Sequence, residues 1–137
     1  MAHLITTLKE TTVEMATWLY PKYQLNFTDS DRQLLLELAF APIHTAGNSI
    51  VISKREAQLA EHPTVQTFLK DLRICVMQDT ISKLGLTKED TYTVISVLIE
   101  DYLEYDDLNV CTELVCMAFL NMHIYALIRT THPTKAK

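Results

Sequence analysis

Glycine is almost absent from this 137-residue chain, which contains only Gly47 and Gly85. Tight turns between strands need backbone conformations with positive φ, and glycine is the residue that adopts them without strain. Two glycines are too few for the many turns of an all-β fold. The sequence therefore predicts helices joined by few connections.

Cysteine is also scarce. Cys75, Cys111 and Cys116 are the three cysteines, and each lies among apolar residues. An odd number without regular spacing does not indicate a disulfide framework, and free cysteine behaves as a small buried hydrophobic group. The first twelve residues, MAHLITTLKETT, lack the basic and apolar regions of a secretory signal. We expect a reducing, cytoplasmic environment.

Basic residues are missing from a long stretch of the chain. No Lys or Arg occurs between Lys88 and Arg129, whereas eight acidic residues do, and the net charge of the whole chain is −5. Nucleic-acid binding requires a basic surface, so this class of function is disfavoured.

Catalytic and metal-binding motifs are missing too. The sequence contains no glycine-rich phosphate loop, no G-x-S-x-G, no H-E-x-x-H and no helical Glu-x-x-His pair. Cys116 and His123, seven residues apart, would share one face of a helix, but two ligands are too few for zinc. We predict no catalytic residue, no cofactor and no metal. His44, in an irregular segment, is the one histidine worth testing for a role.

The residues that are present predict one folded domain. The composition is 48% hydrophobic and 21% charged, which is typical of a globular chain. Apolar spacing and capping signals favour an all-α, single-domain bundle of five to seven helices over residues 1–137. Residues 131–137 are expected to fray.

Proline and capping residues set the expected bounds in the first half. A helix from Ala2 to Tyr20, with Leu8 and Trp18 in its apolar pattern, should end before Pro21. A second helix should begin near Thr28 or Ser30 and end at Pro42. Ser30 with Gln33, and later Ser53 with Glu56, fit capping boxes. The second box should open a short helix that ends near Glu61.

Three further helices are expected in the second half. Pro63 suits the first turn of a helix over 63–84, and Gly85 is a natural residue after its C-terminus. Thr87 and Asp90 fit the start of another helix. The stretch that follows is rich in β-branched residues, but it keeps helical spacing and is too long for a typical strand. The last helix is predicted over about 107–130.

The last predicted helix is apolar on every side. Its sequence, LNVCTELVCMAFLNMHIYALI, is interrupted by Asn121 and His123, and its clean apolar part is shorter than the roughly 20 residues of a membrane span. Such a helix must be buried on all sides, either within its own domain or partly against a second chain. The residues predicted for self-association are Leu114, Met117, Leu120, Met122, Tyr125 and Ile128.

Acidic residues cluster before this last helix. Some can serve as helix caps or form a solvated face, but three crowd the C-terminal end of the preceding helix, where the dipole disfavours anions. No nearby basic residue compensates for them. We therefore predict a site for a basic protein partner at Glu100, Asp101, Glu104, Asp106 and Asp107.

Residues 98–115, LIEDYLEYDDLNVCTELV, resemble the LisH dimerisation motif. Leu98, Ile99 and the trio Asp101–Leu103 match its first half, whereas the expected Gly-Tyr and Thr-Ala pairs are replaced by Asp107-Leu108 and Cys111-Thr112. The resemblance covers 18 residues and implies a helical homodimer.

Together these patterns predict a non-enzymatic helical protein-protein interaction and regulatory module. It would self-associate as a homodimer and bind a partner through an apolar helix face and the acidic patch. Two alternatives remain open: a helical bundle that binds an apolar small molecule, and an enzyme whose active site is assembled from residues far apart in the sequence.

Overall fold

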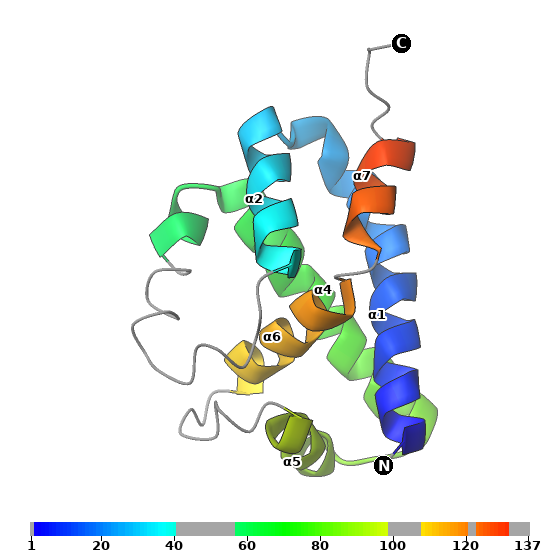
Figure 1. Ribbon diagram of the computed structural model, residues 1–137. Helices are drawn as coiled ribbons and strands as arrows, with labels where there is room; N and C mark the ends of the chain where they lie inside the picture. Colours follow the sequence, from blue (N-terminus) through cyan, green and yellow to red (C-terminus); the bar gives the residue numbers. More distant parts are fainter. Residues whose placement is uncertain (1, 41–56, 99–107, 121–122, 132–137) are drawn as a thin grey trace.

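The computed structural model describes residues 2–40, 57–98, 108–120 and 123–131, which form helices and no strand (Figure 1). Residues 57–60 are helical, and the remaining elements have the following bounds: α1 Ala2–Tyr23, the 3₁₀ helix η1 Gln24–Asn26, α2 Asp29–Phe40, α4 Pro63–Leu84, α5 Lys88–Leu98, α6 Leu108–Leu120 and α7 Ile124–Thr131. The predicted all-α class is confirmed.

Helix α1 continues through the proline that was expected to end it. Pro21 lies inside α1, which ends at Tyr23. Proline removes one helical hydrogen bond and disfavours the helical conformation in the residue before it, but it does not forbid that conformation. Pro21 is exposed and only two residues of α1 follow it. Because proline has no N–H, the carbonyl of Thr17, four residues earlier, lacks its helical hydrogen bond. Water can hydrate this carbonyl at little cost.

The cap of α2 differs from the predicted one. The backbone N–H of Asp31 donates to the Thr28 hydroxyl, and the backbone N–H of Thr28 donates to the Asp31 carboxylate, both at 3.0 Å. These reciprocal bonds form a capping box of Thr28 and Asp31 instead of Ser30 and Gln33. Both boxes fit the sequence, and the choice between them moves the helix start by two residues. The Ser53–Glu56 box lies outside the described residues.

The starts of α4 and α5 agree with the sequence. Helix α4 begins with Pro63 and ends before Gly85, whose φ of 66° is left-handed and whose N–H donates to the Ile81 carbonyl at 2.9 Å. The Asp90 N–H donates to the Thr87 hydroxyl at 3.0 Å and so caps α5. The β-branched stretch in α5 is helical, as predicted.

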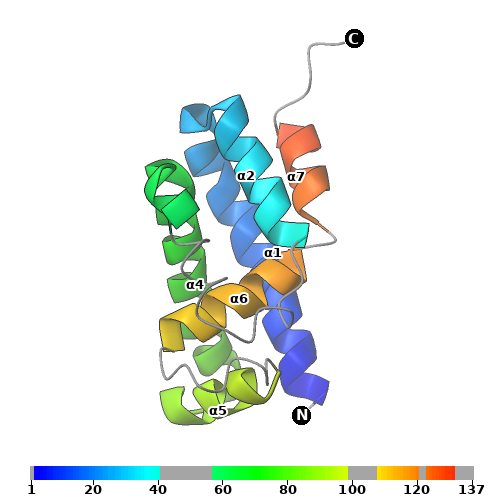
Figure 2. The same cartoon turned by 60° about the vertical axis from the view of Figure 1, so that its left-hand side comes forward.

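The last predicted helix is in fact two helices. Helix α6 ends at Leu120, where the His123 N–H donates to the Leu120 carbonyl at 2.7 Å, and α7 begins at Ile124. The two helices point in different directions (Figures 1 and 2). The apolar pattern runs through the break because both helices bury apolar residues, so it could not reveal the change of direction. Cys116 and His123 therefore do not share one helix.

Helix α6 lies in the middle of the bundle. It contacts α1, α2, α4 and α5, and it crosses between them in Figure 2. Val115, Met117 and Leu120 are buried in a core that also contains Leu35, Leu72 and Ile95. Each such side chain contributes about 1.5–3 kcal/mol through burial. The predicted burial of the apolar helix in the core is thus satisfied by the chain's own helices.

An aromatic cluster joins the C-terminal end of α1 to α4. Phe68 of α4 packs edge-on against Tyr20, Tyr23 and Phe27, with ring centroids 5.6–6.0 Å apart. Tyr20 and Phe68 are fully buried. Edge-on aromatic pairs add about 0.5–1.5 kcal/mol beyond burial. The cluster fixes α1 and α4 side by side.

Candidate functional site

The residues predicted for self-association have different environments. Met117 and Leu120 are buried in the chain's own core, whereas Tyr125 is 52% exposed and Ile128 packs partly against that core. The side chain of Leu114 and all of Met122 lie outside the described residues. Tyr125 is therefore the member of the set that the structure places on the surface. Met117 and Leu120 serve the fold in this single chain.

The predicted acidic site cannot be placed. Glu100, Asp101, Glu104, Asp106 and Asp107 all lie outside the described residues. His44 does too. No helix within the described ranges is both long and apolar enough to cross a membrane, and these ranges hold no group of three or more His, Cys, Asp or Glu side chains suited to a metal ion.

Large apolar side chains are exposed both on α1–η1 and on α4, and α1 and α4 pack against each other. Four large hydrophobic residues are strongly exposed in the described part of the chain: Trp18 at 56%, Leu25 at 89%, Ile74 at 41% and Tyr125 at 52%. Trp18, Lys22 and Leu25 are spaced to follow one side of α1 and η1, and Lys22 Nζ lies 3.4 Å from the centroid of the Trp18 ring. Ile74 lies on α4.

Contacts between polar side chains show how α1 and α4 lie against each other. The Tyr23 hydroxyl donates to the Asp71 carboxylate, and Lys83 Nζ lies 3.1 Å from Glu14, so the two helices run antiparallel. The Lys22 ammonium lies close enough to Cys75 to influence its thiol. Ile74 precedes Cys75 in α4, and successive helical residues point about 100° apart, so the exposed Ile74 side chain has a different direction from that of Cys75. We call Trp18, Lys22, Leu25 and Ile74 the seam patch.

Charged groups along this seam perturb two titrating side chains. The hydrogen bond that Tyr23 donates to Asp71, together with burial, raises the pKa of Tyr23 to about 12. Burial and the Asp71 carboxylate raise the pKa of the Cys75 thiol, and Lys22 opposes the rise. Cys75 is therefore a protonated thiol near neutral pH and a poor nucleophile.

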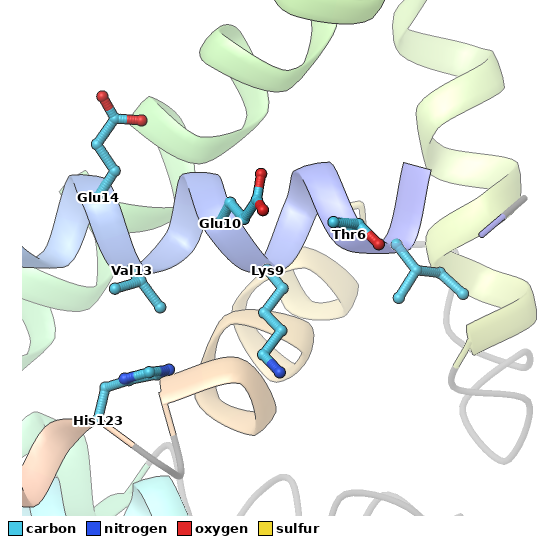
Figure 3. Close-up of a pocket in the computed structure, with 7 residues that line it drawn as sticks. Thr6, Lys9, Glu10, Val13, Glu14 and His123 are labelled. Carbon is cyan, nitrogen blue, oxygen red and sulfur yellow. The ribbon is translucent and has the colours of Figure 1, made fainter. Parts of the chain in front are cut away.

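A groove runs along another side of α1. It has a volume of about 640 Å³ and is bounded by His123 and by α1 residues in two helical rows: Ile5, Lys9 and Val13, and Thr6, Glu10 and Glu14. Figure 3 shows Lys9 and Val13 pointing to the side where His123 lies, and Glu14 pointing to the opposite side. Ile5, Val13 and His123 are half-buried. The groove is thus lined by apolar side chains and by charged groups of both signs, since Glu10 and Glu14 border it as well as Lys9.

A smaller hollow of about 240 Å³ lies next to His62 and Ser30. His62 Nδ1 is 2.7 Å from an Asp31 carboxylate oxygen. Burial raises the pKa of Asp31, but the Thr28 N–H and His62 outweigh it, so the pKa is lowered from its usual value. Asp31 is committed to the cap of α2 and His62 precedes α4. This pair joins two helix starts, so we assign it a structural role.

The seam patch and the groove were not predicted from the sequence. Trp18 was expected in the apolar pattern of α1, but it points outward, because Leu19, one residue further, takes the buried position. The spacing of Trp18, Lys22 and Leu25 was a usable signal for a second apolar face. The groove depends on His123 meeting α1, which no local pattern encodes.

No protein-family model, curated protein or solved structure matches this chain. The resemblance of residues 98–115 to the LisH motif thus has no family match behind it, and residues 99–107 of that segment lie outside the described residues. The function therefore has to be argued from the chain's own surfaces.

Proposed function

We propose that this chain is a non-enzymatic helical interaction and regulatory module that pairs with a second copy of itself through the seam patch. The observation that carries the proposal is the exposure of Trp18, Leu25 and Ile74 on helical segments of α1–η1 and α4, and α1 and α4 pack against each other. Contiguous exposed apolar surface marks association sites, and tryptophan is enriched among residues that dominate interface energies.

The charges around the patch suit a symmetric pair. Lys22 lies on α1, and Asp71 and Asp79 lie on the facing edge of α4. A surface with both signs of charge can meet its own copy without like-charge repulsion. Two-fold pairs are also the commonest oligomers. Self-association, first inferred from the last helix, is therefore assigned to different residues.

Sedimentation velocity at micromolar protein tests the proposal. The wild type should sediment as a dimer, and Ile74→Glu should sediment as a monomer because it places a charge in the interface. Tyr125→Ser is the matched control, since Tyr125 is similarly exposed but lies on α7, and it should leave the dimer intact. Ile74 and Tyr125 are both surface residues, and circular dichroism should show unchanged helix content in both variants.

A monomeric wild type would refute the pairing. Loss of the dimer in Tyr125→Ser but not in Ile74→Glu would move the interface to α7.

The second proposed surface is the acidic run, for which we propose a basic protein partner. Replacing Glu100 and Asp101 with lysine should weaken capture of that partner from cell extract, and unchanged capture would remove the idea.

A further inference from the structure

We draw no further inference here: the strongest candidate, the groove along α1 beside His123, is bordered by charged groups of both signs, and nothing in the structure shows what would occupy it.

Discussion

The carboxylate of Asp31 has two partners at once. One oxygen accepts the Thr28 backbone N–H at 3.0 Å, and the other lies 2.7 Å from His62 Nδ1. The residue is only 7% exposed, so a carboxylate without these partners would be costly to bury. At the scale of single residues, Asp31 therefore fixes both the start of α2 and its distance from the start of α4.

Replacement of Asp31 with asparagine should destabilise the fold by about 2 kcal/mol near neutral pH, because a capping bond weakens and the charged contact with His62 is lost. Urea unfolding measures this difference. The lowered pKa of Asp31 means that its stabilising effect is complete above the ordinary carboxyl pKa and disappears as the pH falls through the folded value. The gap between wild type and Asp31→Asn should therefore shrink below about pH 4.

Asp29 provides the comparison for this prediction. It is almost fully exposed and pairs with Arg32 on the surface of α2. Asp29→Asn should have little effect on stability, and that effect should not vary strongly with pH. An Asp31→Asn penalty that stays constant into strong acid would show that the carboxylate charge is not what stabilises the cap.

At the scale of elements, helix ends are fixed by single residues with special backbone or hydrogen-bonding properties. Gly85 ends α4 with a left-handed φ of 66°, and its own N–H closes the last turn on the Ile81 carbonyl. A Cβ built on Gly85 would meet no atom within 4 Å. The cost of any side chain at this position is therefore conformational and not steric.

Gly85→Ala should lower the free energy of unfolding by about 1 kcal/mol, since alanine rarely adopts positive φ. Gly85→Asn should cost less, because asparagine tolerates the left-handed region. Chemical denaturation of the two variants checks the order. Equal costs for alanine and asparagine would show that something other than backbone conformation limits this position.

At the scale of the whole molecule, α6 is the element that the others surround. Leu120, at its C-terminal end, is fully buried among residues of the same chain. The stability that α6 provides is therefore intramolecular. It does not require a second chain to cover Met117 or Leu120, even though the chain is proposed to dimerise elsewhere.

Leu120→Ala should cost about 3 kcal/mol by leaving a cavity in the core. The loss should be the same at two protein concentrations about tenfold apart, because a penalty arising in a dimer interface would vary with concentration. Thermal or urea unfolding at both concentrations measures it. A loss that grows on dilution would return Leu120 to the interface predicted from the sequence.

Local signals in the sequence were enough for most of the fold. Pro63, Gly85 and Thr87 act within one helical turn of their own positions, so α4 and the start of α5 could be predicted to the residue. The prediction that the first helix ends before Pro21 was wrong, because the cost of a proline in a helix depends on how many helical residues follow it. Ser30 and Thr28 both satisfied the capping pattern, and only the contact of Asp31 with His62, 31 residues away, distinguishes the two.

The sequence by itself determined that this chain is helical and that its most apolar segment is buried, because composition and spacing act through local conformation and through transfer from water. Tertiary structure decided where that segment breaks into α6 and α7, and which side chains remain outside. Trp18, Ile74, Lys9 and His123 belong to surfaces made by helices far apart in the sequence. Their meeting is set by packing, which no local pattern records.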